Sequence, residues 1–214
     1  MPSWPYQVFL PIFAVAMLYL VFWKRRSVRA QLGRSPVVVH QHRDYDKPEG
    51  FLILLFIPGT LAYFFDIGLN AGCPELVTRY LAAPAWRECV WAGVSGFLLM
   101  AAGIGLVGHA MRAMGLSWRI GIDAEAPGPV VSDGPFRFIR HPIYTGMLVL
   151  TAGLALATGD VLACSLAVGT AVALPIQARL EEAFLCSRYP EYAAYMGTSG
   201  RFFPGIGRRR TTVQ

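Results

Sequence analysis

The stretch RHPIYTGMLVLTAGLALATGDVLACSLAVGTAVALPIQA, residues 140–178, decides the fold class. It contains two apolar runs, residues 143–158 and 161–178, which are separated only by Gly159 and Asp160. Because such a short connection joins antiparallel neighbours, the stretch predicts a tight helical hairpin. A helix needs roughly 20 apolar residues to cross a bilayer core, so we expect the first helix of the hairpin to be short and tilted or shallow.

Three further apolar segments precede the hairpin, at residues 6–23, 50–69 and 90–107. The whole chain is 55% hydrophobic, which is more than ordinary soluble proteins contain. We therefore expect an all-α integral membrane protein with about five transmembrane helices.

The same segments suggest how the chain is organised. We expect one domain over residues 1–214, because the chain is short enough for a single domain. Within it, residues 1–89 hold the first two helices and their loops, residues 90–204 form a catalytic core, and residues 205–214 form a basic tail.

Basic residues predict the topology. The first apolar run is followed by a cluster made of Lys24, Arg25, Arg26, Arg29, Arg34, Arg43 and Lys47. The connector between the second and third runs has only Arg79 and Arg87, whereas the loop at 109–142 and the tail from 181 are again basic. Because positive charge accumulates on the cytoplasmic side, we expect the N-terminus outside and the C-terminus in the cytoplasm.

The charge pattern also bears on the partners. The net charge of +6 is compatible with phosphate binding, but most basic residues stand just outside apolar segments and no nucleic-acid-binding motif occurs. We therefore expect contact with membrane lipids and no nucleic acid. Since arginine greatly outnumbers lysine, we expect a bacterial protein of the inner, cytoplasmic membrane.

The four cysteines predict no metal site, since they form neither a CxxC pair nor a Cys/His cluster. Cys73 and Cys89 both fall in the external connector. They would form either a disulfide in an oxidising compartment or two free thiols near the membrane surface.

A first candidate site lies in SDGPFRFIRHPIYTG, residues 132–146. Pro142 suits the first turn of a helix, which places Arg140 and His141 at the helix entrance and Tyr144 about one turn inside. A helix N-terminus favours anions, so the arrangement predicts binding of a carboxylate or a phosphate. The alternative is that the arginines bind lipid headgroups beside an interfacial tyrosine.

A second candidate site follows the last apolar run. Glu181 and Glu182 are adjacent carboxylates at the edge of an apolar helix, where they are costly unless a cation meets them. Arg179 alone is an alternative partner for this pair.

Gly103 and Gly105 form a third feature, inside the run at residues 90–107. Glycine lets a flat ligand or a neighbouring backbone approach closely, and plain helix packing is the favoured interpretation. The pair lies inside an apolar helix rather than after a strand, so it is not a dinucleotide-binding fingerprint.

These residues together resemble a family of membrane methyltransferases that includes isoprenylcysteine carboxyl methyltransferases and phospholipid N-methyltransferases. The first matching element is Gly-Pro-aromatic-Arg followed by Arg-His-Pro-x-Tyr-x-Gly, found here at residues 134–137 and 140–146. The second is Glu-Glu-x-x-Leu, then paired tyrosines, then Arg and Pro, matched by Glu181, Glu182, Leu185, Tyr192, Tyr195, Arg201 and Pro204.

The resemblance implies S-adenosylmethionine bound on the cytoplasmic side, in a pocket formed by the cytoplasmic loop and the C-terminal segment. It implies catalytic roles for Arg140, His141 and Glu182. Cofactor contacts are expected from Gly103, Gly105, Arg140, His141, Tyr144, Glu181 and Glu182. Contacts with a lipid or small lipophilic acceptor, which would enter from the bilayer, are expected from Tyr192, Tyr195 and Arg201. The identity of the acceptor, the choice among O-, N- and S-methylation and the oligomeric state are left open.

Two other classes of protein compete with this interpretation. NADPH-dependent reductases of the sterol type have a related hairpin but usually carry Asn-Tyr and Gly-Glu, where this chain has Ile143-Tyr144 and Gly146-Met147. A non-catalytic transporter or assembly protein should bury charges within its helices, and Asp66 is the only such candidate here.

Overall fold

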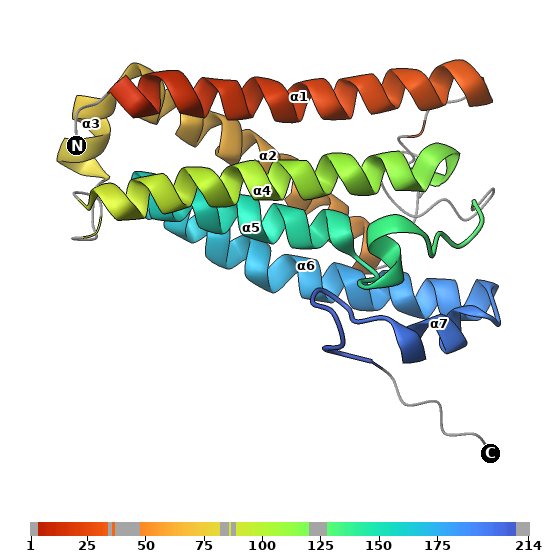
Figure 1. The fold of residues 1–214 in the computed structure, drawn as a ribbon. Helices are drawn as coiled ribbons and strands as arrows, with labels where there is room; N and C mark the ends of the chain where they lie inside the picture. Colours follow the sequence, from red (N-terminus) through yellow and green to blue (C-terminus); the bar gives the residue numbers. More distant parts are fainter. Residues whose placement is uncertain are drawn as a thin grey trace. The chain divides into compact units, whose positions relative to one another are not determined.

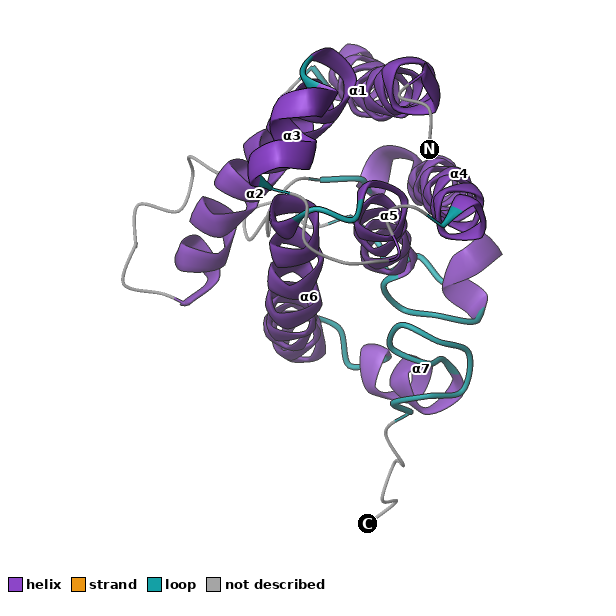
Figure 2. Cartoon of the chain, turned by 90° about the vertical axis from the view of Figure 1, so that its left-hand side faces the viewer, coloured by secondary structure: helices purple, strands orange, loops and turns teal. Residues whose placement is uncertain are grey.

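The computed structural model describes residues 4–33, 36, 48–81, 86, 89–119 and 128–208. Every regular element in these ranges is a helix, as Figures 1 and 2 show. The prediction of an all-α protein is therefore confirmed. Several basic residues used to predict the topology lie outside the described residues, namely Arg34, Arg43, Lys47, Arg87, Arg209 and Arg210.

The helices follow the order of the predicted segments. The α-helices are α1 Trp4–Leu32, α2 Pro48–Gly72, α3 Pro74–Tyr80, α4 Val90–Met114, α5 Pro142–Thr158, α6 Val161–Arg188 and α7 Tyr192–Thr198. Two short 3-10 helices complete the set, η2 Gly115–Ser117 and η3 Gly134–Arg137.

Three of these segments are long and apolar enough to cross a membrane: Pro5–Leu32, Val90–Ser117 and Val161–Arg188, each of 28 residues. Helix α2 has 25 residues, and α5, with 17, is shorter, as the sequence predicts. The apolar helices place the protein in a membrane. The total of about five crossings stays a prediction.

Two helices extend well beyond their apolar runs. Helix α4 continues to Met114, so His109 and Arg112, which we expected in a cytoplasmic loop, lie in its last turns instead. Its end coincides with Gly115, which has a positive φ of 52° and so adopts a conformation common after helix ends. Polar and charged side chains such as His109 and Arg112 are compatible with helical backbone, so the helix continues through them. The positive φ of Gly115 is not an α-helical conformation, so the α-helix ends there.

The hairpin predicted from residues 140–178 is confirmed. Helix α5 ends at Thr158 and α6 begins at Val161. Gly159 adopts the positive φ of 56° that the turn requires. The Asp160 side chain accepts a hydrogen bond from the backbone N–H of Ala163 at 2.8 Å, so it caps α6.

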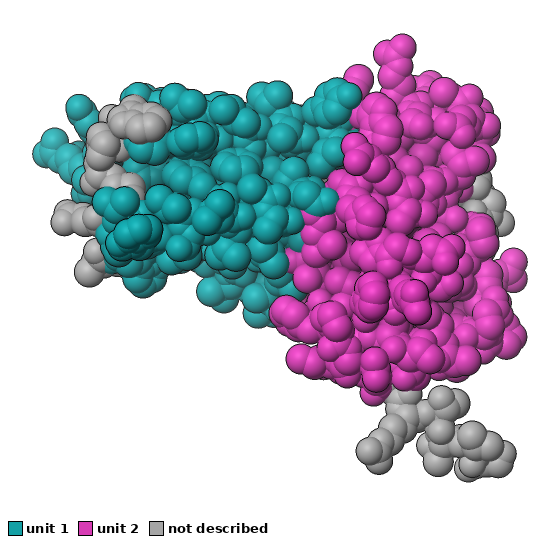
Figure 3. Space-filling model, viewed as in Figure 1, with its two compact units in different colours: residues 1–21, 54–105, 146–173 teal, residues 22–53, 106–145, 174–214 magenta. Residues whose placement is uncertain are grey.

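The chain divides into two compact units, shown in different colours in Figure 3. Unit 1 contains residues 1–21, 54–105 and 146–173, and unit 2 contains residues 22–53, 106–145 and 174–214. The apolar core of unit 1 is formed by Tyr6, Leu10, Tyr63, Ile67, Met100, Leu150, Leu154 and Ala163.

Within unit 1, glycines bring the backbones of α4 and α5 together. A Cβ atom on Gly103 would lie 2.7 Å from the carbonyl oxygen of Gly146. A Cβ atom on Gly96 would lie 2.6 Å from the carbonyl oxygen of Gly153. Such close approach is typical of small residues between membrane helices, which supports the packing interpretation of Gly103.

Unit 1 also contains a buried polar cluster. Asn70 Nδ2 donates to Asp66 Oδ1 at 3.3 Å and to Asp160 Oδ2 at 3.1 Å. All three side chains are buried. Asp66 therefore belongs to a network that joins α2 to the turn of the hairpin. Cys73 and Cys89 are free, exposed thiols in this structure.

Candidate functional site

Arg140 and His141 lie at the entrance to α5, where the sequence predicts them. Pro142 occupies the first position of α5, and Arg140 and His141 are 4% and 7% exposed. Their backbone N–H groups donate to the carbonyls of Gly200 at 2.8 Å and Arg201 at 3.1 Å. The segment after α7 therefore folds back along the residues that precede α5.

The Arg140 guanidinium makes three hydrogen bonds with residues 196–207 and one with α6. Its Nη1 donates to the carbonyls of Ser199 and, at 3.2 Å, Met196. Its Nη2 donates to the carbonyl of Gly207 at 2.9 Å, and its Nε donates to Glu182 Oε1 at 2.8 Å. Four of the five guanidinium N–H positions are thus directed at protein acceptors, so Arg140 holds the returning segment in place.

Glu182 is the centre of a buried ion-pair network. Besides Arg140, it binds Arg201, whose Nη2 lies 2.5 Å from Glu182 Oε2 and whose Nε lies 3.1 Å from each carboxylate oxygen. The hydrogen bond with Glu182 raises the pKa of Arg201 above its usual value. One carboxylate therefore joins α6 both to the residues that precede α5 and to the segment that follows α7.

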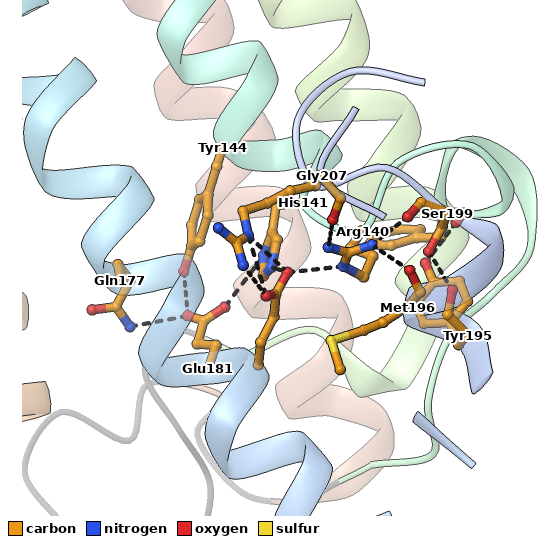
Figure 4. Close-up of polar contacts among 12 residues, drawn as sticks. Arg140, His141, Tyr144, Gln177, Glu181, Tyr195, Met196, Ser199 and Gly207 are labelled. Atoms are coloured by element: carbon orange, nitrogen blue, oxygen red, sulfur yellow. Dashed lines mark hydrogen bonds and ion pairs between the residues drawn. The ribbon is translucent and has the colours of Figure 1, made fainter. Parts of the chain in front are cut away.

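Glu181 has a different environment from its neighbour. Its side chain is 23% exposed, and its Oε1 accepts hydrogen bonds from the Tyr144 hydroxyl and, at 3.0 Å, from Gln177 Nε2. Its Oε2 lies 3.6 Å from His141 Nδ1. Figure 4 shows these side chains converging from α5 and α6. The Glu181 side chain is therefore the more exposed of the two, since that of Glu182 is only 6% exposed.

The His141 ring lies between the two acidic side chains. Its Nε2 is 3.4 Å from Glu182 Oε1, and its ring stacks in parallel on Tyr144, with centroids 5.3 Å apart. The two rings form an aromatic wall beside a negative group. Of the two, the Tyr144 ring is the kind of aromatic face that attracts cations.

The predicted acceptor-binding residues are mostly occupied by structural contacts. The Tyr195 hydroxyl donates to the carbonyl of Phe136 at 2.6 Å, and burial raises the pKa of Tyr195 to about 12. Tyr192 is buried, which likewise raises its pKa, so both phenols are neutral near pH 7. Arg201 is paired with Glu182, as described above. Acceptor contact by these three residues stays a prediction.

The structure thus brings together within unit 2 the two clusters that the sequence placed apart. Arg140, His141 and Tyr144 meet Glu181 and Glu182 directly. Gly103 and Gly105 belong to unit 1 and are not part of this cluster. The role of each residue in ligand binding or catalysis stays a prediction.

Sequence reasoning missed two contributors to the cluster. Gln177 precedes Glu181 by four residues on α6, and that helical spacing alone predicts contact between the two side chains. Thr145 donates through its hydroxyl to the carbonyl of Phe202 at 2.9 Å, for which the sequence carries no signal.

Two further observations bear on ligand binding, the first in unit 2 and the second over all the described residues. A cavity of about 470 Å³ is lined by Pro129, Val130, Ser132, Tyr189, Glu191 and Tyr195, which overlaps the predicted site only at Tyr195. Among the residues that the structure describes, no group of three or more His, Cys, Asp or Glu side chains is arranged to hold a metal ion.

These observations define a class of protein: an apolar, helical membrane protein with a charged cluster at one helical hairpin. Residues 91–192 match the family described as phospholipid methyltransferase. The fold resembles that of the eukaryotic intramembrane Ras methyltransferase, isoprenylcysteine carboxyl methyltransferase, with a TM-score of 0.56, 14% identity, and coverage of 96% of this chain and 70% of that chain. The match of residues 91–192 and the fold both agree with the membrane methyltransferase resemblance that the sequence motifs predict.

Two curated bacterial proteins are also similar. The cobalt-zinc-cadmium resistance protein CzcN of Cupriavidus metallidurans is 31% identical over 139 residues, which cover 63% of this chain and 63% of that protein. The nickel-cobalt-cadmium resistance protein NccN of Alcaligenes xylosoxydans xylosoxydans is 30% identical over 110 residues, which cover 50% of this chain and 52% of that protein. The matches thus span less than two thirds of either relative.

Proposed function

We propose that this protein is an S-adenosylmethionine-dependent methyltransferase that acts on a lipid or small lipophilic acceptor at the cytoplasmic membrane face. The observation that carries the proposal is the direct contact of Arg140, His141 and Tyr144 with Glu181 and Glu182 in unit 2. The family match supports it, because residues 91–192 include the first motif and the part of the second motif from Glu181 to Tyr192.

The chemistry of the cluster fits an adenosyl donor. A bound donor carries its methyl group on a positively charged sulfur and also bears an ammonium group. Glu181 offers a partly exposed carboxylate side chain for a cation, and the stacked rings of His141 and Tyr144 lie beside it. We therefore assign donor contact chiefly to Glu181, His141 and Tyr144.

Arg140 and Glu182 support the same site in a different way. Each is occupied by the other and by the returning segment, so their main contribution is to hold residues 199–207 over the cluster. Methyl transfer gains from alignment of the reacting groups and from exclusion of water, and a fixed segment provides both.

Ligand-dependent thermal stability of the purified chain in detergent tests this proposal. S-adenosylmethionine and S-adenosylhomocysteine should both raise the unfolding midpoint, because a ligand that binds only the folded state stabilises it. NADPH should leave the midpoint unchanged. A shift with NADPH and none with the two adenosyl compounds would favour the reductase class instead.

Transfer of a labelled methyl group into a total lipid extract then identifies the acceptor. The labelled product should partition with lipids, and its mass should reveal the modified group. The Glu181→Gln variant should lose most of the transfer, whereas Glu75→Gln, on the exposed first turn of α3, should retain it. Equal transfer by both variants would show that Glu181 is not part of the site.

A further inference from the structure

Gln177 lies on α6 one turn before Glu181. Among the described residues, the nitrogen of its side-chain amide has a hydrogen-bond partner and the oxygen has none. Its Nε2 donates to Glu181 Oε1 at 3.0 Å. Its Oε1 is buried, and among the residues that the structure describes it has no hydrogen-bond partner. The sequence motifs assign no role to this residue.

The direction of the amide is fixed by chemistry. An ionised carboxylate only accepts hydrogen bonds, so the amide nitrogen of Gln177 must face Glu181 and the carbonyl must point away from it. Figure 4 shows this arrangement, with the carbonyl of Gln177 directed away from Glu181. A flip of the amide would place two acceptors against each other, so it does not satisfy the carbonyl.

A buried acceptor without a partner is costly. Leaving one unsatisfied loses about 1–3 kcal/mol, and folded proteins do so rarely. The cost is explained where a ligand supplies the missing donor. Gln177 adjoins Glu181, the more exposed of the two glutamates in the cluster, so a ligand held by Glu181 would lie close to the Gln177 amide.

We propose that Gln177 recognises the nucleoside portion of the methyl donor, through an N–H or O–H group that donates to its Oε1. The inference rests on the proposed function and adds a residue to it. Glu181 is negatively charged and suits the cationic part of the donor. The neutral carbonyl of Gln177 suits a neutral donor group, such as a ribose hydroxyl or an exocyclic amine.

The test compares two ligands by calorimetry on the full chain in detergent: S-adenosylhomocysteine, and 5′-methylthioadenosine, which lacks the amino-acid portion. Gln177→Met keeps the length of the side chain but removes its carbonyl. It should weaken both ligands by a similar factor of about 5–20, the value of one lost hydrogen bond. Glu181→Gln should weaken S-adenosylhomocysteine more than 5′-methylthioadenosine.

Thermal unfolding without ligand separates recognition from a purely structural role. Gln177→Met should not lower the unfolding midpoint, because removal of the unpaired carbonyl offsets the lost hydrogen bond to Glu181. The matched control is Gln31→Met on α1, where Nε2 of an exposed glutamine donates to Ser27 Oγ at 3.3 Å. This control should change neither ligand affinity nor the midpoint.

The outcomes are distinct. If the wild type binds both ligands and Gln177→Met binds them within about twofold of it, the inference is wrong and the proposed function stands. A variant that loses affinity and midpoint together also contradicts the inference, since that result indicates a structural residue. If the wild type binds neither ligand, the proposed function fails and the inference fails with it. Should Gln177→Met not fold, Gln177→Asn, which retracts the carbonyl by one methylene, should show the same loss of affinity.

Discussion

Two adjacent glutamates with the same chemistry have opposite surroundings in this protein. Glu182 is 5% exposed and neutralised by Arg140 and Arg201, whereas Glu181 is partly exposed and held by uncharged donors. Burial of a charge is tolerated only with good pairing, so Glu182 is committed to the fold. Glu181 is the member of the pair that is available to a ligand.

Replacement of Glu182 should therefore destabilise the protein as well as impair its site. Glu182→Ala leaves the buried Arg140 without its carboxylate, and removing one partner of a buried pair costs about 3–5 kcal/mol. Thermal unfolding in detergent measures this loss. Glu191→Ala, at an exposed position, should cause little change, and equal midpoints for the two variants would contradict the assigned role of Glu182.

At the scale of elements, the crossing of α4 and α5 depends on glycine. Gly103 and Gly105 are two residues apart on α4, yet only Gly103 meets the neighbouring helix. A Cβ atom on Gly105 would have no atom within 4 Å apart from its two chain neighbours and the nearby backbone of its own helix. The two positions therefore form a natural matched pair.

Gly103→Ala should force α4 and α5 apart and lower stability by about 1–3 kcal/mol, the usual cost of overpacking. Gly105→Ala should be neutral or slightly stabilising, because alanine is the better helix former. Unfolding midpoints of the two variants in the same detergent give the comparison. A loss at Gly105 as large as that at Gly103 would mean that backbone contact is not the reason for the glycine.

The helices were largely predictable from the sequence, but their ends and partners were not. Apolar runs located α4 and α6, yet neither run indicated that the helix continues past its polar residues, such as His109 or Glu181. The family resemblance predicted that Arg140 and Glu182 belong to one site, but not their direct ion pair. The backbone carbonyls that accept hydrogen bonds from Arg140 were not predicted. Every residue has a carbonyl, and the sequence does not indicate which carbonyls a turn of the chain will direct at the guanidinium.

At the scale of the whole molecule, the predicted topology can be tested with the cysteines. Cys73 and Cys89 are exposed on the predicted outer side, and Cys186 lies near the end of α6 on the predicted cytoplasmic side. In variants that each keep one cysteine, a membrane-impermeant maleimide should label Cys73 and Cys89 in intact cells. Cys186 should react only after the cells are permeabilised. Labelling of Cys186 in intact cells would reverse the assigned orientation.

The hydrogen bonds around Arg140 also determine when this part of the chain can complete its folding during synthesis. The acceptors at Met196, Ser199 and Gly207 follow Arg140 by more than fifty positions, so the ribosome delivers them after the hairpin has been synthesised. Until then the nascent chain holds a charged arginine with its carboxylate but without its carbonyls. Chains interrupted before Ser199 should therefore be substrates for membrane proteases, because their unfinished polar centre opens readily.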